Sequence, residues 1–362
     1  MDGSNLADTA RRLSDLEVAL FLCLAAREHC LIETTSNCIN DLAKELALIS
    51  WATFDYSYSI VECSSSTSAE DVYNEVLSPD ARANHRATRP WLNTEVSSKR
   101  SSYKSFGDTS KPPATPTPLT NHNVVNIVIA KNFNLASDDL QMHILQLMRS
   151  RELITESGIL NAPEEFLFIP LVARDSDHPQ PPLKKHLLDN LFISHFHSPG
   201  DGYAHLEEDD YLSDGQISTS SVIHKSENHT KRSATLRQKD MAQLRDSSAS
   251  VTTSAEIARY IQDIVVFLRL SRAVSGGVSA KANIEFSRFA ELLAPLHGID
   301  FLTPSIVALA ARKVFRHRII VTAPGEDRSL QYGSNIHAVS HVLAEVTADS
   351  ILDGVLALEP PL

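Results

Sequence analysis

The sequence predicts an α/β domain followed by an all-α domain. Three apolar segments, residues 30–33, 124–130 and 166–172, have the composition of buried strands. Apolar residues recur at helical spacing after each of them, whereas the chain beyond about residue 251 has helical patterns alone. Strands that alternate with helices fit a sheet covered by helices, and a closing run of helices fits a second domain.

The helix before the first strand has a clear start. Ser14 and Glu17 form a capping box, in which the Ser14 hydroxyl accepts from a backbone N–H and the Glu17 carboxylate reaches back. Residues 18–24 are apolar almost all round, which predicts burial on both sides. We expect this helix to run to about residue 26.

Helices are also predicted after the first two strands. Apolar residues at 42, 46 and 49 share one helical face, and Ser137 followed by two aspartates has the pattern of a helix N-terminus. Pro170 cannot donate a ladder hydrogen bond, so the third strand is predicted to lie at a sheet edge or to end there. Residues 182–192 are predicted to form a short helix.

Two polar segments interrupt these patterns. Residues 62–122 and 196–250 are rich in Ser, Thr, Pro and charged residues, which favours disorder over a packed core. The second segment holds an acidic cluster at 207–210, which is either a solvated surface or a docking or phosphorylation region. The predicted domains are therefore an α/β core over 10–195, a disordered linker over 196–250 and a helical domain over 251–362.

Composition excludes several classes of function. The 362 residues have a formal net charge of −12, which argues against a general surface for nucleic acid or acidic membranes. The spacing of the four cysteines matches neither a disulfide framework nor a zinc site. Since no secretory signal or membrane-spanning segment is evident, we expect a soluble, reduced protein of the cytosol or nucleus.

The helical domain resembles the lid of AAA+ ATPases of the MoxR and magnesium chelatase ATPase-subunit group. That family has a G-x-S-x-R-A motif at the start of one lid helix, and this chain has Gly277, Ser279 and Ala282 in that pattern, with Lys281 in place of the arginine. A later family segment of the form V-T-P…L-x-H-R is matched by Thr303, Pro304, His317 and Arg318.

The resemblance extends upstream through weaker matches. A glutamine-led helix of the family has its counterpart in six residues here: Asn134, Gln141, Leu145, Met148, Arg151 and Thr155. Leu188-Asp189 resembles the family's L-D-R-F segment, and residues 29–33 and 42–44 bracket the place of the phosphate loop. The resemblance implies a P-loop-type AAA+ three-layer core with a C-terminal helical lid and two disordered insertions.

The residues that hydrolyse ATP in that family are missing from the matched positions. Residues 34–41 contain neither glycine nor lysine, and Asn40 and Asp41 stand near the places of the phosphate-loop Lys and Thr. Lys131 and Asn132 align with the acids that hold Mg²⁺, Val172 with the sensor asparagine and Asn190 with the arginine finger. Loss of one transition-state charge partner already costs on the order of 10³ in rate, so this alignment predicts no hydrolysis.

Lys281 is the one candidate for cofactor binding. By the resemblance it keeps a positive charge where the lid arginine would touch the γ-phosphate, and the alternative is a solvated lysine after the Gly276-Gly277 turn. No catalytic residue is predicted, and no cofactor is expected; ATP and Mg²⁺ enter only if the chain is active.

Two other groups of basic side chains are candidate sites. His195 and His197 lie on one side of an extended segment and, with His186 or His205, could bind a metal, although surface histidines are the simpler interpretation. Residues 316–318, Arg-His-Arg, could contact a neighbouring subunit or an anion, or could complement the dipole at a helix C-terminus. We expect no metal site.

The favoured function is non-catalytic: a degenerate AAA+ protein that acts as a scaffold, an adaptor or a ring subunit. Its partner is expected to be a protein, for which the resemblance offers AAA+ ring subunits, and not nucleic acid or membrane. One alternative is an active magnesium chelatase-like ATPase subunit in which Lys131 or Lys44 supplies charge. Another is a signalling adaptor that works through its Ser-rich insertions.

Overall fold

The centre of the molecule is a five-stranded parallel sheet. The computed structural model describes residues 3–78, 123–155, 158–174, 183–207, 236–357 and 360. The strand order is β2-β5-β8-β1-β9, and every neighbouring pair is parallel. The strands are β1 (His29–Thr34), β2 (Tyr58–Glu62), β5 (Ile127–Lys131), β8 (Leu167–Ala173) and β9 (Leu191–Phe196).

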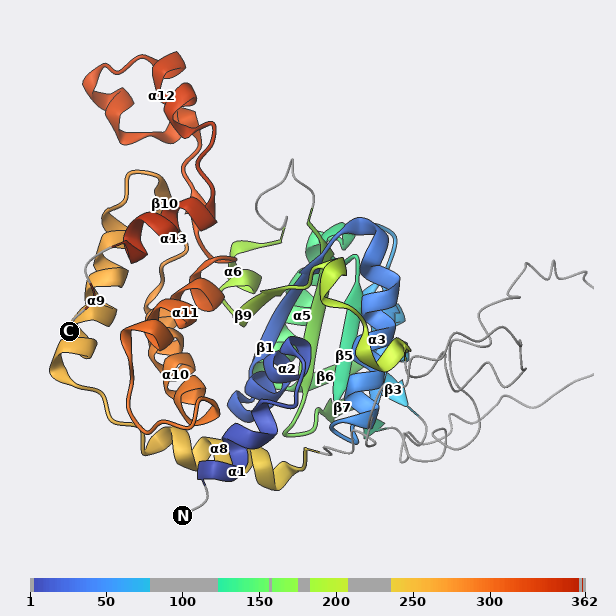
Figure 1. The fold of residues 1–362 in the computed structure, drawn as a ribbon. Coiled ribbons are helices and arrows are strands. Elements are labelled where there is room, and N and C mark those ends of the chain that lie inside the picture. The colour runs from blue at the N-terminus through green and yellow to red at the C-terminus, as the bar shows by residue number, and fades with distance from the viewer. Residues whose placement is uncertain are drawn as a thin grey trace, which may run out of the picture.

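Helices cover both faces of the sheet (Figure 1). One buried cluster joins α2 and α3 to the sheet, and a second joins the sheet to α4, α5 and α6 on the other face. Apart from α2, which precedes β1, these helices lie in the connections between parallel strands, which need crossovers of this kind. The core helices are α1 (Gly3–Ala10), α2 (Asp15–Ala26), α3 (Ile39–Ala52), α4 (Ala69–Val76), α5 (Asp138–Ser150) and α6 (Lys185–Leu188). Two small antiparallel pairs flank the sheet: β3 (Leu77–Ser78) with β4 (Asn123–Val124), and β6 (Glu152–Thr155) with β7 (Gly158–Asn161).

The predicted helix starts are confirmed. The capping box of Ser14 and Glu17 is present at α2, whose apolar residues are buried on all sides because α8 and α10 cover the face turned away from the sheet. Ser137 caps α5 by accepting from Leu140 N at 3.2 Å. Gln141, in the middle of the family-like pattern, links α5 to α6 by accepting from Lys184 N at 3.0 Å.

Two strands were missed by the sequence prediction. The stretch 182–192, expected as a helix, holds only the short α6 before β9 begins at Leu191. The run Leu-Phe-Ile-Ser-His-Phe of β9 has no period that separates a buried strand from a buried helix. Strand β2 was not identified either, although its side chains alternate between buried and more exposed positions.

Pro170 lies inside the sheet, contrary to the expected edge position. Strand β8 pairs with β5 on one side and β1 on the other, and Pro170 stands opposite Ala130. The missing N–H removes a single ladder hydrogen bond, worth about 1 kcal/mol. Complete burial of Leu167, Phe168 and Ile169 beside it offsets that cost.

The predicted boundaries of the polar segments need correction. Helix α4 lies in the first segment, and α8 (Gln238–Ala249) lies in the stretch expected to be a disordered linker. Met241 and Leu244 of α8 are buried in the same cluster as α2, so this helix belongs to the packed structure. Residues 79–122 and 208–235, with most of both predicted insertions, lie outside the described residues.

The helical domain stands beside the β9 edge of the sheet (Figure 1). Its elements are α9 (Ala255–Leu270), β10 (Val274–Gly276), α10 (Ala280–Leu296), α11 (Pro304–Phe315), β11 (Ile320–Val321), α12 (Ile336–Leu343) and α13 (Ala348–Leu356). Helix α11 packs along β9, and Phe192 of that strand meets Phe289 of α10 with ring centroids 5.4 Å apart. The domain therefore covers what would otherwise be an open sheet edge.

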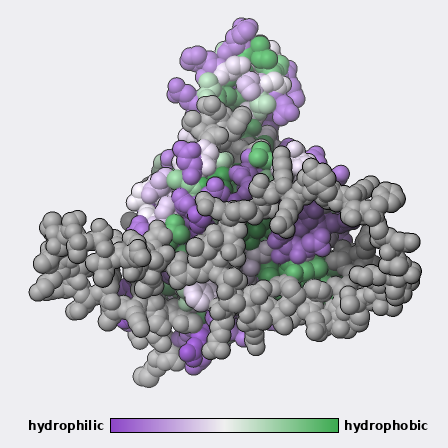
Figure 2. All heavy atoms as spheres, turned by 90° about the vertical axis from the view of Figure 1, so that its right-hand side faces the viewer, coloured by the Kyte–Doolittle hydropathy of each residue, from purple (hydrophilic) through white to green (hydrophobic). Residues whose placement is uncertain are grey.

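The segment around α12 projects from the rest of the domain (Figure 1). Hydrophobic and hydrophilic residues are mixed on its surface (Figure 2). Tyr332, Ile336 and Val342 are its exposed large apolar residues, and the Tyr332 side chain is almost fully exposed. None of the described helices is long and apolar enough to cross a membrane.

Candidate functional site

The candidate site is the edge of the sheet where the parallel strands end. Strand β1 lies between β8 and β9, and the chain leaves it through a loop and α3 to reach β2 beyond β8 and β5. The last strand, β9, lies on the other side of β1. Such a reversal of direction beside the carboxyl end of a strand is where open α/β sheets bind ligands.

The loop between β1 and α3 does not form an anion-binding nest. Ser36–Cys38 makes a 3₁₀ turn, α3 begins at Ile39, and no residue of 34–41 has a positive φ. Residues 34–41 therefore lack the alternation of right- and left-handed residues with which one kind of nest points successive N–H groups at an anion. The Thr34 hydroxyl is also engaged, since it donates to the carbonyl of His197 at 3.0 Å.

A polar group that we call the carboxyl-edge cluster closes the site beside α3. It consists of Asn40, Glu62, Lys131 and Asn132. Lys131 Nζ donates to Asn40 Oδ1 at 2.9 Å and forms an ion pair with Glu62, and Asn132 Nδ2 donates to Glu62 Oε1 at 2.7 Å. The charge of Lys131 is thus offset by the Glu62 carboxylate.

A second group, the Glu33 network, joins the end of β1 to the lid. It consists of Glu33, Arg174, Arg316 and Asp349. Arg316 of the segment after α11 lies 3.4 Å from Glu33 and 3.2 Å from Asp349, and Arg174 lies 3.0 Å from Asp349. Both guanidinium groups stack near the Phe196 ring. Burial raises the pKa of Glu33 to about 7, against the lowering effect of the Arg174 charge.

The remaining predicted positions at this edge have structural surroundings. Val172 stands opposite Glu33 in the sheet and its side chain is buried in the cluster formed with α4 and α5. Asp41 lies in the first turn of α3, 3.6 Å from Lys44. The structure therefore brings Asn40, Lys131 and Asn132 together, with Asp41 nearby and Val172 turned into the core.

Lys281 and Asn190 lie at the end of the sheet where the parallel strands begin, opposite the end that holds the candidate site. Lys281 Nζ donates to Asn190 Oδ1 at 2.6 Å and lies 3.5 Å from Glu285. Asn190 directly precedes β9, whose six residues span about 20 Å. The lysine is thus neither a freely solvated residue nor a neighbour of the β1–α3 loop within this chain.

The lid motif residues serve the contact between core and lid. Ser279 donates to Asp189 Oδ1 at 2.6 Å, and His317 Nε2 lies 2.8 Å from the carbonyl of Leu191. Arg318 is almost fully buried, pairs with Glu285 and donates to the carbonyl of Phe192 at 3.1 Å. Burial raises the pKa of Glu285 to about 7, opposed by the Arg318 charge.

The two histidines of β9 and its extension are buried, contrary to the surface interpretation. His195 Nδ1 lies 2.9 Å from Lys313 Nζ, and burial together with the Lys313 charge lowers the pKa of His195 to about 3. The His197 ring packs against Tyr203. Within the described part of the chain, no group of three or more His, Cys, Asp or Glu side chains is placed to hold a metal ion.

Several site residues were not identified from the sequence: Glu33, Glu62, Arg174 and Asp349. Of these four, only Glu33 could have been identified as a site residue from its sequence context, because a carboxylate at the end of an apolar strand is expected to be buried and paired. Arg174 and Asp349 are 175 positions apart in the sequence and meet only through the fold.

Comparisons with known proteins agree with this architecture. Residues 267–335 match the family model described as the AAA lid domain. A crystal structure of a protein provisionally named as an ATPase, from Cytophaga hutchinsonii, superposes with a TM-score of 0.55 at 14% identity over 95% of this chain and 94% of that one. At that identity the likeness concerns the fold.

A curated relative matches a smaller part. It is the maintenance of telomere capping protein 2 of Lachancea thermotolerans, which is 32% identical over 108 residues, or 28% of this chain. The match spans 38% of that relative's length. With its parallel three-layer core and matched lid, the chain has the fold of an AAA+ ATPase.

Proposed function

We propose that this chain is a degenerate AAA+ protein of the MoxR and magnesium chelatase type, which acts as a non-hydrolysing scaffold, adaptor or ring subunit. The observation that carries the proposal is the closed loop at the end of β1. Residues 34–41 form a 3₁₀ turn without a left-handed residue, so their N–H groups do not converge on a phosphate.

The charges around that loop support the same proposal. Lys131 pairs with Glu62, and Arg316 and Arg174 share Asp349. A triphosphate with Mg²⁺ would have to displace these carboxylates, and no Asp or Glu occupies the positions that align with the Mg²⁺-binding acids. Phosphoryl transfer depends on positioned cations, and the Glu62 carboxylate already offsets the charge of Lys131.

A protein partner is favoured by the surface of the lid. Tyr332, Ile336 and Val342 expose apolar area on the projecting segment around α12. Exposed tyrosine and aliphatic side chains on such a projection are the residue types that become buried on association.

The proposal is tested by a turnover assay on the purified full chain. With ATP and Mg²⁺ at millimolar concentration, we expect phosphate release no faster than in the protein-free blank, and no change in Lys131→Ala, Lys44→Ala or Lys281→Ala. Turnover in the wild type that Lys131→Ala or Lys44→Ala abolishes would establish the alternative, an active ATPase subunit with an unorthodox site.

The likeness to a telomere capping maintenance protein favours one setting for the scaffold. We propose that the matched 108 residues let this chain act in the same process. Expression of the full chain in a Lachancea thermotolerans strain that lacks its own protein should restore telomere capping. Failure of a stably expressed chain to restore it would remove this setting and leave the scaffold proposal to the turnover assay.

A further inference from the structure

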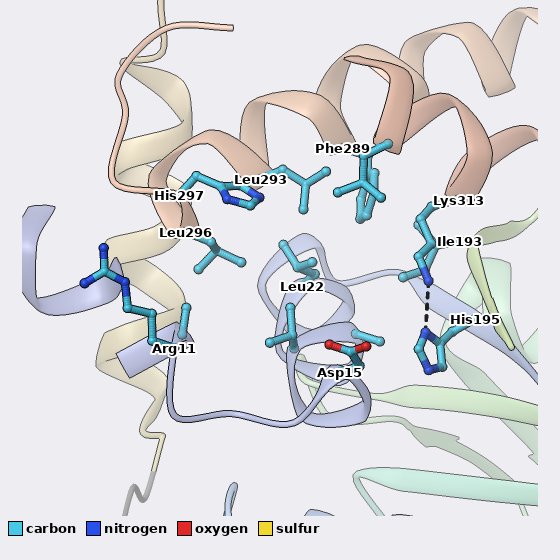
Figure 3. Close-up of a pocket in the computed structure, with 14 residues that line it drawn as sticks. Arg11, Asp15, Leu22, Ile193, His195, Phe289, Leu293, Leu296, His297 and Lys313 are labelled. Carbon is cyan, nitrogen blue, oxygen red and sulfur yellow. Dashed lines mark hydrogen bonds between the residues drawn. The ribbon is translucent and has the colours of Figure 1, made fainter. Parts of the chain in front are cut away.

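A cavity of about 360 Å³ lies between the core and the lid. Its walls come from α2, β9, α10 and α11 together with the end of α1 (Figure 3). Leu22 faces Phe289, Leu293 and Leu296 across it, so most of the lining is apolar. Since one water molecule takes up about 30 Å³ in the liquid, the cavity has room for a molecule of roughly ten non-hydrogen atoms or more.

Two cations line this apolar cavity, Arg11, which pairs with Asp8 at 3.3 Å, and Lys313. Lys313 Nζ donates to His195 Nδ1 at 2.9 Å (Figure 3), and the described residues offer the ammonium no ion-pair partner. Asp15 also lines the cavity, and its charge acts on Lys313 only from a distance. Burial lowers the pKa of Lys313 and the Asp15 charge raises it, so the ammonium is only partly compensated.

The histidine beside it adds a second unmet requirement. His195 is about 95% buried and its pKa is held far below neutrality by burial, so the ring is neutral near pH 7. Because Nδ1 accepts from Lys313, Nε2 carries the proton, yet this buried N–H has no hydrogen-bond partner. The Nε2–H is closed off from solvent and lies across the ring from Lys313, so the ammonium is the group that a ligand in the cavity would contact.

We propose that this cavity binds a small amphipathic monocarboxylate, with its apolar body between α2 and α10 and its carboxylate on Lys313. A carboxylate supplies the single negative charge that the ammonium lacks, and an aliphatic chain fills walls made of leucine and phenylalanine. The Asp15 carboxylate also lines the cavity, and its negative charge disfavours a dianion or a polyphosphate. Since core and lid both contribute walls, the ligand also ties the two parts together.

The experiment uses octanoate, with octan-1-ol as a neutral probe of the same chain length. Calorimetric titration of the full chain should give one octanoate site and at least about tenfold weaker binding of the alcohol, because a charge-assisted hydrogen bond is lost. Lys313→Met should weaken octanoate binding about tenfold to hundredfold while leaving the alcohol unchanged. Lys44→Met, a lysine outside the cavity, is the matched control and should bind as the wild type does.

A second variant tests the cavity without changing Lys313, in case the Lys313→Met protein does not fold. Leu309 lines the cavity but is 38% exposed, so Leu309→Trp should fold, narrow the cavity and weaken both probes. Equal affinity for acid and alcohol, unchanged octanoate binding in a folded Lys313→Met, or no octanoate binding at all would overturn the proposal. Binding of adenosine, in place of octanoate, to the same residues would overturn it too and would assign the cavity to a nucleobase.

Discussion

Single carboxylates decide the charge state of the candidate site. Glu33 is the second-last residue of strand β1, where apolar neighbours exclude water and Arg316 lies 3.4 Å away. Its pKa is raised to about 7, from an ordinary value of 4.5, since burial outweighs the nearby guanidinium charge. The folded protein therefore binds a proton at Glu33 that the unfolded chain has already released above about pH 5.

Replacing Glu33 by Gln should remove part of the pH dependence of stability. A pKa raised on folding gives stability that is fully present below pH 4.5 and is lost as the pH rises through about 7, at most about 3 kcal/mol. The difference in unfolding free energy between Glu33→Gln and wild type, from urea titrations at pH 4.5 to 8, should follow this trend. The exposed Glu326→Gln is the control, and a pH-independent difference for Glu33→Gln would contradict the assignment.

At the scale of elements, the turn between β10 and α10 explains the glycine of the lid motif. Gly277 has φ +94°, and a Cβ there would lie 1.7 Å from the carbonyl oxygen of Arg318. The same Arg318 holds Glu285 of α10 and the carbonyl of Phe192 in β9. The motif residues thus fix the lid against the core, a role that is independent of nucleotide.

Gly277→Ala should therefore destabilise the protein by about 3 kcal/mol or more, because both the φ and the contact are unfavourable. Gly276→Ala is the matched control, since its Cβ would meet only Ile320 Cδ1 at 3.5 Å, and its effect should stay within about 0.5 kcal/mol. Chemical denaturation of the two variants measures the difference. Equal stabilities would mean that the turn does not adopt this conformation.

The sequence predicted those elements that have local signals. The capping box of α2, the N-cap of α5 and the three long lid helices follow from residues within one or two turns. It missed β2 and β9 because a short apolar run fits a strand or a helix equally well. It misplaced Pro170 because the rule for edge strands ignores how much apolar area a central position buries.

The candidate site was predicted in part. Asn40, Lys131 and Asn132 were assigned to one site through the resemblance to AAA+ ATPases, and the fold brings these three residues together. The partners that neutralise the site, Glu62 and Asp349, come from distant segments and carry no local signal. Lys281 was assigned by analogy to a nucleotide, whereas its contact with Asn190 depends on how the lid packs on β9.

For the whole molecule, core and lid share one hydrophobic cluster. That cluster contains residues of α2, β1 and β9 together with residues of α8, α10 and α11. The buried pair of Arg318 and Glu285 and the contact of Phe192 with Phe289 lie at the same boundary. An interface of this kind should make the two parts unfold together.

Calorimetry should accordingly record one unfolding transition. Phe289→Ala, which removes a buried ring at the boundary, should lower the stability of the whole protein by about 3 to 5 kcal/mol without dividing the transition. Leu270→Ala on the exposed face of α9 is the control, with a change near zero. Two separate transitions in the wild type would show that core and lid fold independently.

The central claim is that this AAA+ fold has closed its nucleotide site. It is tested most directly by calorimetric titration of the wild-type chain with ATP and Mg²⁺, beside Lys131→Ala and Lys281→Ala. The account predicts no binding heat at millimolar nucleotide in any of the three proteins, because the loop after β1 offers no nest and its cations are paired. Saturable binding by the wild type that Lys131→Ala abolishes would contradict it.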